Sequence, residues 1–290
     1  MVEINVEEIN VIFLCLAVLS SSMVAVVMRM GTRKVQHNIG MLTVNYIVCT
    51  LLAAFYGNLQ TTFDPGNPLV IRTLVLGMVN GGFYLAGFLL MQTNINKNGV
   101  VLSSIFQKLG LLVTLVLSVV VYREIPNVLQ SCGFVIAIAA IILMNYQKGS
   151  GSVGSRTMLI VMLLVNGMAE GMSKVFKEAV TDPTLDGQFL LLTFATALVL
   201  CVILMKVKGQ KVGLAEAAFG ALIGIPNFFC TKFLLGALES LSSVIVYPVF
   251  SVGTILVVTM TGVLAFRERL NRRQWTAVAA ILAALVLLNI

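Results

Sequence analysis

The chain consists almost entirely of apolar runs, each long enough to cross a lipid bilayer. Of its 290 residues, 59% are hydrophobic and only 11% are charged, and a soluble domain of this composition would aggregate. A helical run of ~20 apolar residues matches the ~30 Å hydrocarbon core of a membrane. The sequence therefore predicts an all-α membrane protein with ten transmembrane helices, at residues 9–30, 39–57, 69–92, 99–122, 126–146, 156–180, 187–206, 213–237, 242–266 and 271–289.

The remaining composition excludes several classes of protein. The formal charge of +7 comes from Lys and Arg at the ends of the runs, without a basic stretch that interleaves aromatics, so no nucleic-acid partner is expected. Because the chain begins with acidic rather than basic residues, its first apolar run is expected to be a retained span and not a signal peptide. The cysteines lack CxxC spacing and lie within apolar runs, which favours buried free thiols: Cys15, Cys49, Cys132, Cys201 and Cys230. We expect no metal and no cofactor.

The two halves of the chain resemble each other at a shift of 144 residues. This shift pairs residues of distinct chemistry: Arg123-Glu124 with Arg267-Glu268, Phe106 with Phe250, Gln130 with Gln274, and Asn145 with Asn289. A Gly/Ser-rich linker at 148–155 separates two predicted five-helix repeats, residues 1–147 and 156–290. Because five is odd, the second repeat must enter the membrane from the opposite side. The prediction is an inverted-topology repeat, the architecture of many alternating-access transporters.

Basic residues are unequally divided between the two ends of this predicted bundle. The opposite loops hold only Arg72, Arg123 and Lys177. By the positive-inside rule, the richer set of thirteen lies in the cytoplasm and both termini lie outside a cell membrane. That set is Arg29, Arg33, Lys34, Lys97, Lys148, Arg156, Lys206, Lys208, Lys211, Arg267, Arg269, Arg272 and Arg273.

Together these features resemble the drug/metabolite transporter superfamily, in particular its EamA-like branch with ten helices. The resemblance covers both halves. It rests on an acidic residue after the fourth helix of each repeat (Glu124, Glu268), on the glutamine that begins the next helix, and on the segment Tyr247-Pro248-Val249-Phe250. Glu124 and Glu268 also directly precede a helix, whose dipole favours a negative charge there, so a structural role is expected for both.

The chain departs from the family pattern at several points. Arginine stands where glycine usually precedes the acidic residue, the Trp-Gly of the first helix is absent, and Ser104 occupies the position that matches Pro248. Members often have both termini in the cytoplasm, which conflicts with the charge distribution. The resemblance implies a multi-pass transporter of the bacterial cytoplasmic membrane for metabolites ranging from amino acids to cations. It also makes Tyr247 a candidate substrate-binding residue.

Four ionisable side chains lie within the apolar runs, where charge is costly and usually functional. Glu170 is the only acidic residue well inside a run, and the flanking Gly167 and Gly171 would let a helix or a substrate approach. Apolar surroundings favour its neutral form, so Glu170 is a candidate proton carrier or cation counter-ion. The alternative is a structural pair with Lys174, one helical turn later.

The other two ionisable residues are lysines. Lys108 lies near the middle of its run, too far from the ends to reach the interface, so we expect it to line a cavity or to have a partner. Lys232, like Lys174, is nearer a run end. Snorkelling therefore explains those two as well as substrate binding does.

Two corresponding positions in the halves carry helix-weakening residues, Asn80-Gly81-Gly82 and Gly224-Ile225-Pro226-Asn227. Proline frees a carbonyl, and paired interruptions of this kind point to a transporter's binding site. Asn80 and Asn227 are thus candidate substrate ligands, although close helix packing through small residues is the alternative. We expect the substrate near the midplane, between the first, third, fourth, sixth, eighth and ninth spans, with the fifth and tenth at the periphery.

The predicted function is secondary active transport. The chain lacks GxxxxGK[ST], HExxH and GxSxG, which disfavours ATP-driven transport and an enzyme. Three lysines against one glutamate favour a small polar metabolite such as an amino acid or an organic anion, handled by an exporter or a proton/solute exchanger. The alternatives are a carrier of cationic amines or drugs with Glu170 as counter-ion, and a non-transporting scaffold or receptor. The expected partners are a small-molecule substrate, protons and the lipid bilayer, for a monomer or a homodimer.

Overall fold

The computed structural model describes residues 6–32, 34–56, 66–123, 127–145, 153–238 and 243–288. These residues form helices and no strand, which confirms the prediction of an all-α protein. The elements are α1 (Val6–Gly31), α2 (Asn38–Tyr56), α3 (Pro68–Asn98), α4 (Val100–Lys108), α5 (Leu111–Tyr122), α6 (Val128–Asn145), α7 (Val153–Ala179), the 3-10 helix η1 (Pro183–Leu185), α8 (Asp186–Val207), α9 (Leu214–Leu238), α10 (Ser243–Leu264) and α11 (Arg272–Leu288).

Several of these helices are suited to crossing a membrane. Within the described ranges, five contain stretches that are long and apolar enough: Val11–Gly31, Asn38–Tyr56, Pro68–Asn98, Asp186–Val207 and Leu214–Leu234. Shorter apolar stretches occupy Val128–Ala140 in α6 and Val249–Leu264 in α10. The protein is therefore a multi-pass, membrane-embedded helical protein.

The predicted fourth span, 99–122, is not one helix. It divides into α4 and α5 at Leu109 and Gly110, directly after Lys108. Backbone hydrogen bonds here run between residues three apart, from Gly110 N to Gln107 O (3.1 Å) and from Val113 N to Gly110 O (2.8 Å), which is the tighter 3-10 pattern. A Cβ on Gly110 would lie 2.8 Å from the backbone nitrogen of Gly167 in α7. The chain turns where another backbone crosses it.

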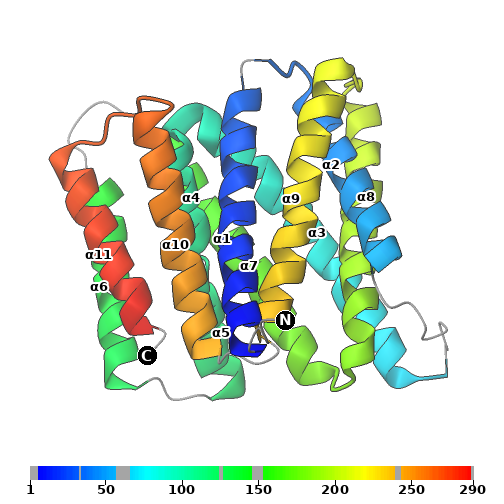
Figure 1. Cartoon of the computed structure of the whole chain (residues 1–290), viewed down its shortest axis with the longest axis horizontal. Coiled ribbons are helices and arrows are strands. Elements are labelled where there is room, and N and C mark those ends of the chain that lie inside the picture. Colours follow the sequence, from blue (N-terminus) through cyan, green and yellow to red (C-terminus); the bar gives the residue numbers. More distant parts are fainter. Residues whose placement is uncertain are drawn as a thin grey trace, which may run out of the picture.

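The helices form a bundle in which neighbours in space are mostly distant in sequence (Figure 1). α6 and α11 pack on each other at one edge, and α2 and α8 pack at the other edge. Between them, α9 contacts α1 and α2, while α3 contacts α7 and α8. A shift of 144 residues places α1, α2 and α3 at the positions of α7, α8 and α9. The contacts of α9 with α1 and α2 therefore correspond to those of α3 with α7 and α8.

Local structure also recurs at this separation. Arg123 and Arg267 both adopt left-handed backbone conformations, with φ of 53° and 54°. Before α6, Asn127 and Gln130 exchange side chain–backbone hydrogen bonds of 2.8 and 3.0 Å, and Asn271 and Gln274 do the same before α11, at 2.8 and 2.9 Å. Each pair is a reciprocal helix cap, which explains why the glutamine occurs in both halves.

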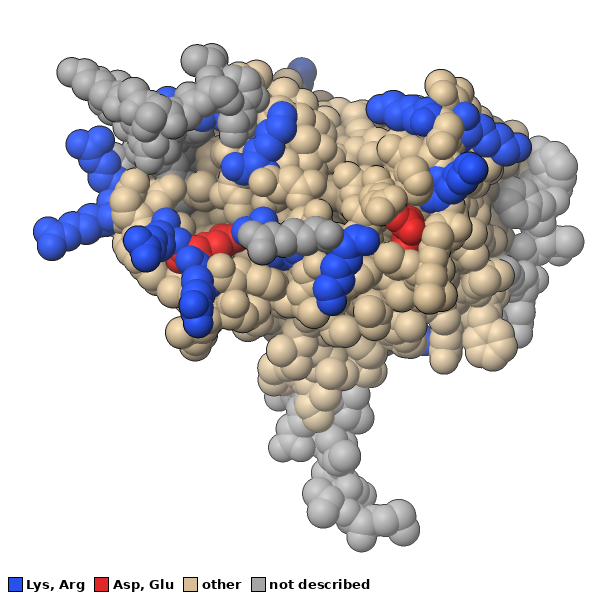
Figure 2. All heavy atoms as spheres, turned by 90° about the horizontal axis from the view of Figure 1, so that it is seen from above, with Lys and Arg blue, Asp and Glu red and all other residues tan. Residues whose placement is uncertain are grey.

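One end of the bundle is cationic. Seen from above, Lys and Arg side chains gather on the end where α1, α3, α8 and α10 finish (Figure 2). Glu216, in the first turn of α9, accepts hydrogen bonds at this end from the backbone of Gln36 and His37, both at 3.0 Å. These bonds satisfy donors at the start of α2, so an acidic side chain of the second half caps a helix of the first.

Candidate functional site

Lys108 is the only buried lysine or arginine among the described residues. It is the last residue of α4 and only 8% exposed, and its Nζ lies 3.7 Å from the ring centroid of Phe250 in α10. Cation–π attraction to this ring and the negative end of the α4 dipole both stabilise a buried ammonium. The helix break therefore gives Lys108 an environment that a continuous fourth span would not provide.

Glu170 faces the interior of the bundle. It follows Leu163 by seven residues and Asn166 by four, so the three share one face of α7. Leu163 is buried, and the Asn166 side chain lies against Gly87 of α3. Glu170 itself is exposed, although it interacts electrostatically with Lys108. The groups with which Glu170 interacts, Lys108 and Tyr84, belong to α4 and α3.

Further polar groups surround this pair. Tyr84 of α3 interacts electrostatically with Glu170, and its hydroxyl is hydrogen-bonded with Thr231 of α9. Cys230 of α9 interacts with Lys108 and is hydrogen-bonded with Ser21 of α1. We call the group Lys108, Glu170, Tyr84, Cys230, Thr231 and Phe250 the central site. With Ser21, its residues come from α1, α3, α4, α7, α9 and α10, the six spans from which a binding site was expected.

The structure brings two of the predicted site residues together, Lys108 and Glu170. Gly167 lies where α7 meets Gly110, so the expectation that glycine beside Glu170 permits close approach holds for this residue. The side chains of Lys174 and Tyr247 lie outside the described part of the structure. The predicted pair of Glu170 with Lys174 therefore stays a prediction.

Asn227 lies at the contact of α9 with α2. Its Nδ2 donates to Asn45 Oδ1 at 3.3 Å and lies 3.4 Å from Cys49 Sγ. Cys49 in turn donates to the carbonyl of Gly224 at 3.4 Å. Asn227 thus has protein partners in a buried polar network, and α9 continues as a helix through Pro226.

Asn80 is also buried, at 1% exposure, and α3 runs through it without interruption. The adjacent Gly81 packs closely on α8, because a Cβ there would lie 2.7 Å from Thr196 Cβ. The expected interruptions in the third and eighth spans are therefore close helix contacts, and the break lies in the fourth span instead. Small residues allow backbones to approach, so they do not by themselves interrupt a helix.

Lys232 is exposed, and its Nζ lies 3.9 Å from the ring centroid of Tyr56, at the end of α2. This position near two helix ends agrees with snorkelling to the interface. The sequence did not predict Tyr84, Cys230 and Thr231 as site residues, because a single polar group on an apolar helix has no characteristic spacing to other polar groups. The sequence match between Phe106 and Phe250 marked Phe250 as a distinctive position, but it did not predict the contact with Lys108.

Comparisons with known proteins agree with this architecture. Residues 9–146 match the EamA-like transporter family. An uncharacterized protein of Haemophilus influenzae is 22% identical over 201 residues, covering 68% of this chain and 69% of its own length. A protein crystal structure superposes on 96% of this chain and 95% of its own with a TM-score of 0.61 at 13% identity, so the two share a fold.

Proposed function

Residues 9–146 belong to the EamA-like transporter family of the drug/metabolite transporter superfamily, and from this premise we propose that the protein is a secondary active transporter for a small zwitterionic metabolite such as an amino acid. A membrane transporter of this type needs a site that both sides of the membrane can reach in turn. The central site is proposed as that place, and proton exchange as the source of coupling.

The architecture proposed is a pair of inverted repeats. The recurring left-handed arginines, the recurring helix caps and the exchange of helix contacts at a shift of 144 residues all support it. Rocking of one half against the other would then expose the central site alternately. The cationic end (Figure 2) is proposed as cytoplasmic, with both termini on the other side of a bacterial cell membrane.

One observation carries the choice of substrate: opposite charges meet in the interior without forming a salt bridge. Lys108 and Glu170 interact electrostatically, yet the only salt bridge among the described residues joins Arg29 and Glu268. We propose that these two opposite charges bind a solute that itself carries both signs. A substrate carboxylate would bind Lys108 and a substrate ammonium would bind Glu170, with Phe250 and Tyr84 beside them.

The same pair explains how protons would be coupled. An uncompensated charge inside a membrane is costly, so Glu170 must be neutralised by a cation or a proton. When the substrate ammonium leaves, a proton replaces it, and the two compete for one carboxylate. A purely cationic amine fits less well, because Lys108 would repel it.

The experiment is binding of matched solutes to the purified protein, followed as a shift of its unfolding temperature. We expect a zwitterionic amino acid to stabilise the protein, and its methyl ester and N-acetyl derivative to fail, since each lacks one charge. Lys108→Met and Glu170→Gln should each abolish the shift, whereas Lys232→Met, outside the central site, should keep it. Equal stabilisation by the ester would contradict zwitterion recognition.

A further inference from the structure

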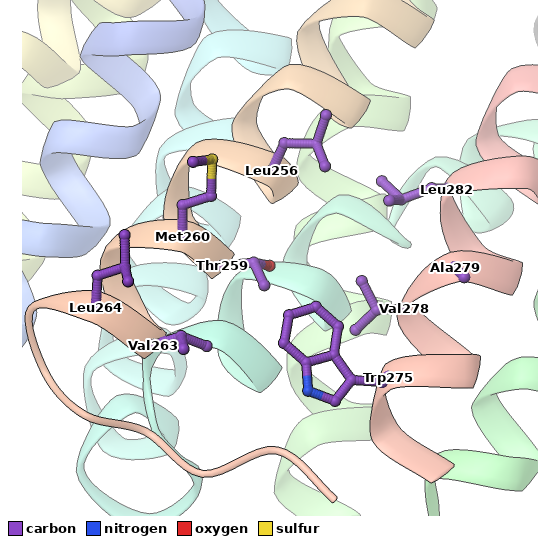
Figure 3. Close-up of a pocket in the computed structure, with 9 residues that line it drawn as sticks. All are labelled: Leu256, Thr259, Met260, Val263, Leu264, Trp275, Val278, Ala279 and Leu282. Carbon is purple, nitrogen blue, oxygen red and sulfur yellow. The ribbon is translucent and has the colours of Figure 1, made fainter. Parts of the chain in front are cut away.

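The lipid-facing surface carries an apolar groove between α10 and α11 (Figure 3). It has a volume of about 370 Å³ and is lined on α10 between Leu256 and Leu264 and on α11 between Trp275 and Leu282. Met260 and Leu264 are 61% and 74% exposed, so the groove opens outward. It is separate from the central site, to which α11 contributes no residue.

The groove has the length of one membrane leaflet. At a rise of 1.5 Å per residue, the stretch from Leu256 to Leu264 measures roughly 12 Å. Half of the hydrocarbon core measures about 15 Å. Leu264 and Trp275 form the end beside the α10–α11 loop, whereas Leu256 and Leu282 form the far end (Figure 3). An alkyl chain that enters from the loop end would thus terminate near the bilayer midplane.

The loop end of the groove is strongly basic. Arg267, Arg269, Arg272 and Arg273 all lie within seven positions of the chain there, and all four are exposed. Trp275, 48% exposed, has the place of an interfacial aromatic. Basic clusters beside a groove between transmembrane helices attract anionic lipid headgroups.

A polar atom lies in the wall of the groove. Thr259 is 5% exposed, and its hydroxyl oxygen has no hydrogen-bond partner among the described residues. Figure 3 shows this side chain between α10 and α11, facing the groove. A buried hydroxyl without a partner costs free energy. Thr259 lies five residues, roughly 7.5 Å, before Leu264 along α10, so it would lie beside an acyl chain and below the headgroup.

We infer that this groove binds one anionic phospholipid, with an acyl chain between α10 and α11 and the phosphate among the four arginines. Charge complementarity decides the occupant. A second copy of the chain would bring the same four arginines to the groove and be repelled. This inference does not depend on the transported solute, because it concerns a different surface and is measured without transport.

Native mass spectrometry of the purified, delipidated protein tests the site with phosphatidylglycerol and with phosphatidylcholine of identical acyl chains. Phosphatidylglycerol should bind in preference, and inorganic phosphate should not displace it. Ala279→Phe should fill the groove and abolish binding, whereas Ala283→Phe, exposed one turn further along α11 and outside the groove lining, should leave it intact.

A second pair of variants separates local recognition from general attraction. Replacing Arg272 and Arg273 by Gln should weaken phosphatidylglycerol binding by about 30-fold. The same change at Lys206 and Lys208, on the same cationic end but at the end of α8, should have little effect. These substitutions are all at exposed positions, so they preserve the fold.

Three outcomes would overturn the inference. Equal binding of the two lipids would show an unspecific apolar groove. Displacement by inorganic phosphate would show a simple anion site. A change in the ratio of monomer to dimer with Ala279→Phe, at unaltered lipid binding, would identify a second copy as the occupant.

Discussion

The carboxylate of Glu268 accepts hydrogen bonds from the backbone N–H groups of Val100 (2.8 Å) and Val101 (3.2 Å), at the start of α4. These hydrogen bonds agree with the structural role expected for Glu268, but they serve α4 and not the helix directly after it, because Asn271 and Gln274 cap α11. Gly99, before α4, provides no capping side chain. A carboxylate from the other half of the chain replaces the missing cap, and Arg29 Nε of α1 lies 3.5 Å from it.

Glu268→Ala should lower the free energy of unfolding by about 1–2 kcal/mol, the usual effect of losing a helix cap. The loss follows from unsatisfied donors at the start of α4 together with a cation, Arg29, left without its partner. Thermal unfolding in detergent measures it. Glu178→Ala, at an exposed position of α7, is the matched control, and equal stability of the two variants would refute the cap.

Gly99→Ala should also destabilise the protein, by about 1–3 kcal/mol. Gly99 has φ of 85°, and a Cβ there would lie 2.8 Å from both carboxylate oxygens of Glu268. Gly82→Ala, in the middle of α3 with nothing within 4 Å of the new Cβ, should instead be neutral or stabilising by up to ~1 kcal/mol. Chemical denaturation of the two variants compares them directly, and a similar response of both would contradict the close contact at Gly99.

Glu170→Gln should abolish accumulation of the solute against its gradient in proteoliposomes while leaving counterflow exchange partly intact. The amide keeps the shape of the side chain but cannot exchange a proton. If Glu170 only pairs with Lys174, the single change should destabilise the protein by up to ~3–5 kcal/mol, and the added change Lys174→Met should restore stability. Recovery of proton-driven uptake in this double variant would disprove coupling through Glu170.

A reporter at the C-terminus that is active only in the cytoplasm should stay silent. The cationic end of the bundle holds the α10–α11 loop, and the positive-inside rule places that end in the cytoplasm. The same reporter inserted in the α8–α9 loop, beside Lys208, should be active. The reverse pattern would overturn the orientation and leave the fold unaffected.

Features that depend on residues close together in the chain could be predicted from the sequence. Apolar runs determine where helices form, since each run must satisfy its own backbone within the bilayer. The caps of α6 and α11 depend on residues three apart, and they recur with the 144-residue match. The need for a partner or a cavity at Lys108 followed from its distance to either end of its run.

Only the tertiary structure decided which distant groups meet. The break after Lys108 depends on a crossing of Gly110 with Gly167, and the partner of Asn227 is Asn45, 182 residues earlier. Glu268 caps a helix that begins 168 residues before it. Hydrophobicity along one helix specifies its length and its apolar surface. In a chain that is apolar nearly everywhere, however, it does not specify which face meets which neighbour, because that is decided by close packing of small residues and by the few buried polar groups that must find partners.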